Sequence, residues 1–185
     1  METKLTVQQI QRLIVEHEGG PRKNTFVPNV SWGFFRTHEA DLVMLSKAGY
    51  LTEYEIKRSW SDFLADFKKT TNHFEGKVMQ LYYVVPECIA DKCWEFIKNH
   101  EWKEPYNPRM CLDYPPVGLI WYSEEGRVHT KQYAPLLARF TESDNNDYKL
   151  FLEEQLAIMR LGVMRLWTRK EPQQPQAQNE TLFER

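Results

Sequence analysis

The segment DLVMLSKAGYLTEYEIK, residues 41–57, predicts a β-hairpin. Two strand-like runs, Asp41–Ser46 and Tyr50–Lys57, flank the tripeptide Lys47-Ala48-Gly49. A three-residue hairpin loop needs a left-handed backbone at its third position, where glycine is least strained. Pairing Ser46 with Tyr50 then places Asp41 opposite Glu55, and Glu39 opposite Lys57.

The sequence on both sides of this hairpin predicts alternating helices and strands. Thr6 and Gln9 form a capping box for a helix that ends at Gly19-Gly20. We then expect a loop over 21–28, strands over 30–36, 80–85, 117–122 and 127–133, and helices from Ser59, over 87–99 and over 147–167. The prediction is an α/β fold, a mixed central sheet flanked by helices, in one domain over 1–168. Residues 169–185 are predicted to be a disordered polar tail.

The composition excludes several classes of protein. The chain has 185 residues, a net charge of -2 and a pI of about 6.2, so a general basic field for nucleic acid is absent. No apolar run approaches ~18 residues, and the first residues lack the layout of a secretory signal. The three cysteines are an odd number without metal-ligand spacing. We therefore expect a reduced, cytoplasmic protein that does not span a membrane.

Three charged residues of the hairpin are the candidate for chemistry. Residues two apart in a strand share a face, so Glu55 and Lys57 project together, and Asp41 joins them from the neighbouring strand. Two facing carboxylates repel each other, and a bound Mg²⁺ or Mn²⁺ reverses that interaction. A lysine beside the metal can orient the attacking water or stabilise charge on a phosphate. The alternative is a surface salt bridge, worth ~0–1 kcal/mol.

The same residues resemble the PD-(D/E)XK nuclease superfamily, and more narrowly its MmcB-like putative DNA-repair nucleases. The motifs are Glu39-Ala40-Asp41, Lys47-Ala48-Gly49-Tyr50, Glu55-Ile56-Lys57 and the helix that begins after Ser59, within a resemblance over roughly residues 6–135. Ala40 stands where the family has its proline. The resemblance implies a restriction-endonuclease-like fold, with Asp41 and Glu55 as metal ligands and Lys57 serving the water.

Further candidates border this set. Some members of the superfamily add a glutamate from the first helix, for which Glu18 is the candidate, although a solvated helix-end glutamate is the better explanation. Six basic residues are candidates for phosphate contacts: Arg22, Lys23, Arg58, Lys68, Lys69 and Lys77. Lys68 and Lys69 also suit the negative end of a helix. His38, His73 and Glu53 are expected to be ordinary surface or hydrogen-bonded residues.

The leading functional hypothesis is a Mg²⁺- or Mn²⁺-dependent deoxyribonuclease, acting on DNA in repair or in the processing of mobile elements. One alternative is a catalytically silent module that binds nucleic acid. Another is a protein–protein adaptor acting through the helix over 147–167, whose apolar stripe suits packing on the sheet or association into a homodimer. The form of the nucleic acid and the choice between endonuclease and exonuclease stay open.

Overall fold

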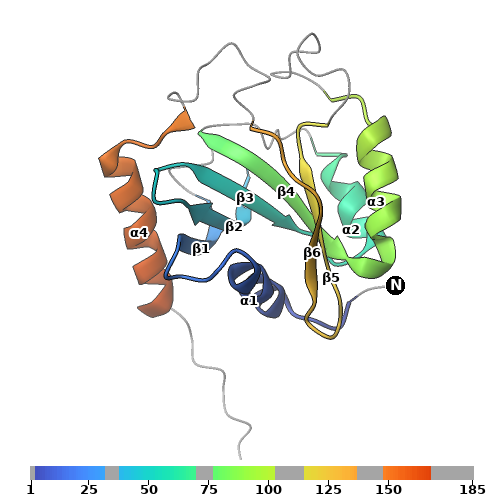
Figure 1. Ribbon diagram of the computed structural model, residues 1–185, viewed down its shortest axis with the longest axis horizontal. Helices are drawn as coiled ribbons and strands as arrows, with labels where there is room; N and C mark the ends of the chain where they lie inside the picture. Colours follow the sequence, from blue (N-terminus) through green and yellow to red (C-terminus); the bar gives the residue numbers. More distant parts are fainter. Residues whose placement is uncertain (1–2, 32–37, 70–76, 103–114, 137–147, 168–185) are drawn as a thin grey trace, which may run out of the picture.

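The computed structural model describes residues 3–31, 38–69, 77–102, 115–136 and 148–167. One six-stranded sheet, in the order β1-β2-β3-β4-β5-β6, forms the centre of the molecule (Figure 1). The elements are α1 (Val7–His17), β1 (Thr25–Val30), β2 (Ala40–Leu45), β3 (Leu51–Ile56), α2 (Trp60–Asp66), β4 (Val78–Pro86), α3 (Glu87–Asn99), β5 (Gly118–Tyr122), β6 (Val128–Gln132) and α4 (Leu152–Trp167).

The sheet is mixed, as the sequence predicted. Strands β1 to β3 are antiparallel, β4 runs parallel to both β3 and β5, and β6 is antiparallel to β5. Helices α2 and α3 make the two crossovers that parallel neighbours require. The fold is therefore α/β, with a mixed sheet flanked by four helices. In the part of the chain that the structure describes, none of the helices has the length and apolar character to cross a membrane.

The β2–β3 hairpin has the predicted register. Leu42 pairs with Tyr54 and Leu45 with Leu51. At the turn, the backbone N–H of Ser46 donates to the carbonyl of Tyr50 over 2.9 Å. Gly49 has a φ of 89°, the left-handed conformation that its place in the loop requires. The same register puts Asp41 at the level of Glu55.

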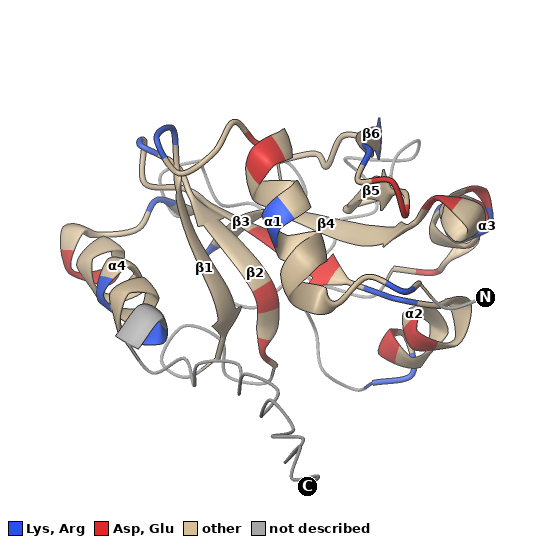
Figure 2. Ribbon diagram, turned by 90° about the horizontal axis from the view of Figure 1, so that it is seen from below, with Lys and Arg blue, Asp and Glu red and all other residues tan. Residues whose placement is uncertain are grey.

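The helices cover the sheet unequally. Helix α1, with its predicted Thr6–Gln9 capping box, packs on one face, where Ile10 and Ile14 contact the apolar side chains of β2, β3 and β4. The other face is covered at two places. Helix α4 covers the β1–β2 side, and helices α2 and α3 cover β4 and β5 (Figures 1 and 2). The side chains of this face form two separate apolar clusters.

Strand β1 corrects one prediction. It occupies Thr25–Val30, within a segment expected to be a loop as far as residue 28. Pro28 lacks a backbone donor, which argues against a strand in the interior of a sheet. At the edge, where β1 lies, proline is tolerated. Residues 32–36 of the strand expected over 30–36 lie outside the described residues, as do His73, Cys111 and the tail.

Helix α4 corrects a second prediction, because it begins at Leu152 and not near residue 147. Lys149 instead forms a β-bridge with Tyr50, and the N–H of Leu150 donates to the carbonyl of Gly49. The apolar stripe, which was expected either to pack on the sheet or to mediate association, includes Leu156 and Met159, which are 41% and 37% exposed. Ile158 is fully buried against β1, and Arg165 donates to the carbonyl of Asn29.

Candidate functional site

The charged side chains of β3 lie on the face that α2, α3 and α4 cover. They occupy the stretch between the two apolar clusters of that face. Glu53 is 0% exposed, Glu55 3%, and Lys57, which directly follows the strand, 4%. Burying charge is costly unless the charges are paired and hydrogen-bonded. The surface salt bridge considered from the sequence is therefore replaced by an interior set of charges.

Lys57 lies between two carboxylates. Its Nζ is 2.8 Å from Oε2 of Glu55 and 3.0 Å from Oδ1 of Asp66. Burial alone would lower the pKa of Lys57, but the charges of Glu55 and Asp66 outweigh burial and hold that pKa above its ordinary value. Lys57 is therefore a cation at neutral pH.

Asp66 comes from the last turn of α2, which the Ser59 cap fixes in place. The hydroxyl of Ser59 accepts from the N–H of Asp62, as the sequence predicted. Asp66 is itself 4% exposed and receives two further contacts, from the hydroxyl of Tyr83 at 3.1 Å and from Nζ of Lys69 at 2.7 Å. Asp66 thus connects Lys57 to α2, to β4 and to a partly exposed lysine.

Asp41, the second residue of β2, completes the predicted set. Its Oδ2 accepts a 2.8 Å hydrogen bond from the backbone N–H of Ile56, which stands between Glu55 and Lys57 in the chain. Its carbonyl accepts from Gln11 of α1 over 2.7 Å. Burial raises the pKa of the Asp41 carboxyl. The hydrogen bond from the N–H of Ile56 and the charge of Lys57 lower this pKa by less, so it lies above its ordinary value. The structure therefore brings Asp41, Glu55 and Lys57 together at one end of the hairpin.

Two residues that the sequence treated as ordinary belong to this site. Nε2 of His38 is 2.8 Å from Oε1 of Glu53, and one ligand atom from each of His38, Glu53 and Glu55 lies within 4.8 Å of the others. Glu53 is buried and not a solvated strand residue. Its position two residues before Glu55 was the available signal, since the period of a strand puts both on one face. His38 was noticed because it borders the hairpin in the sequence, whereas no signal pointed to Asp66.

Glu18 does not join the site. It caps the end of α1, where its charge adds to burial in raising the pKa of Tyr54. Tyr54 points to the α1 face, opposite to Glu55, because neighbouring residues of a strand alternate. The sheet therefore separates Glu18 from the proposed metal ligands, which corrects its assignment as a third one.

The six basic candidates are dispersed over the molecule. Among them, Lys69 contacts the site through its ion pair with Asp66. Arg58 donates to the carbonyl of Thr3 over 3.1 Å, and Lys77 pairs with Glu154 of α4 over 2.9 Å. Lys68 is exposed just after α2. Arg22 and Lys23 are also exposed and precede Thr25, which pairs with Leu45 at the turn end of the hairpin. That end is roughly 13 Å from Asp41 along β2.

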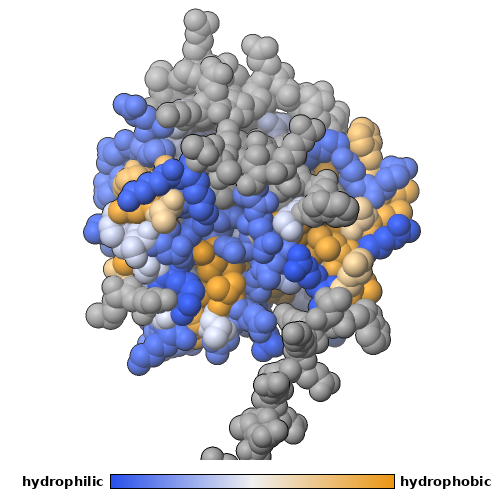
Figure 3. Space-filling view, turned by 180° about the vertical axis from the view of Figure 1, so that it is seen from behind, coloured by the Kyte–Doolittle hydropathy of each residue, from blue (hydrophilic) through white to orange (hydrophobic). Residues whose placement is uncertain are grey.

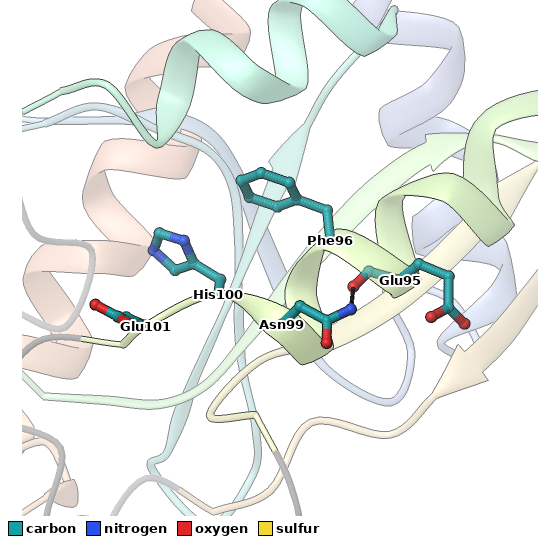
Figure 4. Close-up of a pocket in the computed structure, with 5 residues that line it drawn as sticks. All are labelled: Glu95, Phe96, Asn99, His100 and Glu101. Atoms are coloured by element: carbon teal, nitrogen blue, oxygen red, sulfur yellow. Dashed lines mark hydrogen bonds between the residues drawn. The ribbon is translucent and has the colours of Figure 1, made fainter.

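A second surface feature lies at the end of α3. An open depression of about 690 Å³ is lined by Glu95, Phe96, Asn99, His100 and Glu101 (Figure 4). The rings of Phe96 and His100 stack there, with centroids 5.5 Å apart. The lining comes from one helix end and the two residues after it, and it includes none of the residues predicted to carry chemistry.

Comparison with known proteins adds support for the fold alone. The chain matches no known protein family and no curated protein. It is similar to a solved structure, the SPO1766 protein of unknown function from Silicibacter pomeroyi, with a TM-score of 0.50 and 16% sequence identity over 89% of this chain and 88% of that chain. At that identity, the likeness concerns the arrangement of helices and strands and not the chemistry of the site.

Proposed function

We propose that this protein is a metal-dependent nuclease that hydrolyses phosphodiester bonds of DNA. The observation that carries the proposal is the buried Glu55–Lys57 pair, beside which the Asp41 carboxylate is held on the N–H of Ile56. The resemblance of these residues and their hairpin to the PD-(D/E)XK superfamily supports the same reaction. DNA repair and mobile-element processing are the proposed settings, and the cytoplasm is the proposed location.

The residues present fit a divalent cation. Asp41 and Glu55 supply carboxylate oxygens, the ligands that Mg²⁺ and Mn²⁺ prefer. His38, Glu53 and Glu55 each bring one ligand atom within 4.8 Å of the others, and this group does not include Asp41, so Glu55 is the residue that the two sets share. When bound, the cation would lower the pKa of a coordinated water and stabilise negative charge on the phosphate.

Lys57 acts in this proposal as a fixed positive charge. Because the carboxylates beside it hold its pKa above the ordinary value, it does not accept a proton from water at neutral pH. Its ammonium group can donate hydrogen bonds to the attacking water or to a phosphate oxygen, where negative charge develops. Asp66 is then a positioning residue, since its Oδ1 holds the ammonium group together with Glu55.

The test is cleavage of labelled single-stranded and duplex DNA with Mn²⁺ and with EDTA. We expect metal-dependent cleavage by the wild type, and a loss of at least ~100-fold in Glu55→Gln and Lys57→Met. Glu18→Gln and Lys98→Met are matched controls, because they change the same residue types away from the site and should keep the activity. Thermal unfolding of each variant separates loss of chemistry from loss of fold.

Three results would overturn the proposal. Cleavage that survives in folded Glu55→Gln and Lys57→Met would place the activity elsewhere or in a contaminant. Metal-independent DNA binding without cleavage of any substrate would favour the catalytically silent module, and absence of both binding and cleavage would favour the adaptor. Mn²⁺ titration by calorimetry adds a readout besides activity, since Glu55→Gln should weaken binding and Glu18→Gln should not.

A further inference from the structure

Helix α4 has a second apolar face, which points away from the sheet. Its inward face is already docked. Ile158 is fully buried, and Gly162 approaches Val27 so closely that an added Cβ would lie 3.1 Å from that side chain. Glu154 pairs with Lys77, and Arg165 donates to the β1 carbonyl of Asn29. The exposed apolar side chains of α4 are therefore not the ones that attach this helix to the sheet.

Four of these side chains form a straight stripe. Leu152 is 65% exposed, Leu156 41%, Met159 37% and Val163 53%. They are separated alternately by four and three residues, which is the spacing of the core positions of a coiled coil. Hydrophobic surface is visible on the side of the molecule that α4 forms (Figure 3). Contiguous exposed apolar surface on a folded domain marks an interaction site.

The charges beside the stripe identify the partner. Glu153 and Arg160 are exposed, seven residues apart, and lie on the same flank of the stripe. In an antiparallel pair of α4 helices, Glu153 of each copy faces Arg160 of the other, so two complementary contacts form across a twofold axis. A parallel pair instead brings together the two acidic helix starts and the two basic ends. The division of charge along α4 is visible in Figure 2.

We propose that the outward face of α4 binds a second copy of this chain, as an antiparallel helix pair. Leu152 then packs near Val163 of the second copy, and Leu156 near Met159. The seam spans two heptads, so the interface is at the small end of specific interfaces, and we expect a reversible dimer with a dissociation constant of about 1–100 µM. This inference is independent of the proposed nuclease activity.

Sedimentation velocity of the full chain over about 1–500 µM tests the proposal. We expect the wild type to shift from monomer to dimer and Leu156→Glu to stay a monomer. Tyr133→Glu is the matched control, since Tyr133 is 74% exposed but directly follows β6, at the opposite edge of the sheet from β1, on which α4 packs. It should dimerise like the wild type. Circular dichroism verifies that each variant is folded.

A charge exchange tests the orientation of the two helices. Arg160→Glu opposes Glu153 of the second copy and should weaken the dimer about tenfold, whereas the double variant Glu153→Arg, Arg160→Glu should restore it. Failure of the double variant to recover would overturn the antiparallel arrangement. A wild type that stays monomeric, a dimer that persists in Leu156→Glu, or assembly beyond a dimer would each overturn the proposal.

Discussion

The two faces of β3 are equally buried but chemically opposite. On the α1 face, Tyr54 and Ile56 pack among apolar side chains, whereas the other face presents Glu53 and Glu55, with Lys57 directly after the strand. Apolar burial stabilises the fold directly. A buried ion pair often contributes less than well-packed apolar residues of similar volume. The charged face is therefore poorly explained by stability, and a reaction or a ligand explains it better.

The largest effect expected is from removing the cation on the charged face. Lys57→Met leaves Glu55 and Asp66 buried without their shared partner, which should lower the free energy of unfolding by about 3–5 kcal/mol. Urea denaturation at pH 7 measures it. If the loss comes from uncompensated charge, adding Glu55→Gln and Asp66→Asn to Lys57→Met should recover most of it. A loss that stays the same in the triple variant would contradict this explanation.

The pH dependence of the same variant has a definite sign. Since the pKa of Lys57 is raised in the fold, its stabilisation is complete below the ordinary lysine value of 10.5 and is lost as the pH rises above it. The difference in stability between the wild type and Lys57→Met should therefore shrink at pH values above 10.5.

On the apolar face, Leu42→Ala should cost about 3 kcal/mol, because it opens a cavity beside Tyr54 in a fully buried position. This loss involves no ionisable group. Urea denaturation at pH 7 and again above pH 10.5 should give the same difference from the wild type. A difference that follows pH as in Lys57→Met would contradict the contrast between the two faces.

Removing one tyrosine hydroxyl on each face compares the strength of the hydrogen bonds that the two faces contain. Tyr83→Phe removes the donor to the Asp66 carboxylate and should cost about 1–2 kcal/mol, because hydrogen bonds to charged groups are the stronger ones. Tyr54→Phe on the α1 face is the matched deletion. Its hydroxyl donates to the sulfur of Met44 at 3.8 Å, a weak acceptor, and its loss should cost less. Thermal unfolding ranks the two variants, and an equal or reversed order would contradict the prediction.

The smallest effect expected is stabilising. Burial raises the pKa of Asp41, so its ionised form is disfavoured in the fold, and stability from this group increases as the pH falls through its raised pKa. Asp41→Asn keeps an acceptor for the N–H of Ile56 without the charge and should be more stable than the wild type at pH 7. This advantage should diminish toward pH 3.8, as denaturation at several pH values would show. A less stable variant at pH 7 would mean that the carboxylate is favourably paired.

The hairpin was predictable because its information is local. Lys47-Ala48-Gly49 fixes the loop, the loop fixes the register, and the register brings Asp41 to Glu55 and Lys57. Glu53, His38 and Asp66 illustrate what local sequence does not contain. Alternation places Glu53 beside Glu55, but only the tertiary arrangement buries it and brings the end of α2 to Lys57.

Helix α4 shows a different limit of the sequence. Its most regular apolar stripe, through Leu156 and Met159, was compatible with packing on the sheet and with association into a homodimer. The fold instead buries a face of mixed composition around Ile158 and Gly162. This face lies close to β1, and it is held by a hydrogen bond to the carbonyl of Asn29 and by an ion pair with Lys77. Hydrophobic periodicity identifies a face that prefers to be covered, but it does not specify whether the sheet or another molecule covers it.

The irregular end of β1 has a consequence for solubility. An edge strand with free backbone groups is a template for strand addition and aggregation. Pro28 removes one donor from this edge, Asn29 turns the chain with a φ of 52°, and Arg165 occupies the Asn29 carbonyl. An incoming strand therefore meets an interrupted row of partners. The proline that made β1 hard to recognise in the sequence also makes this edge a poor site for intermolecular β-sheet growth.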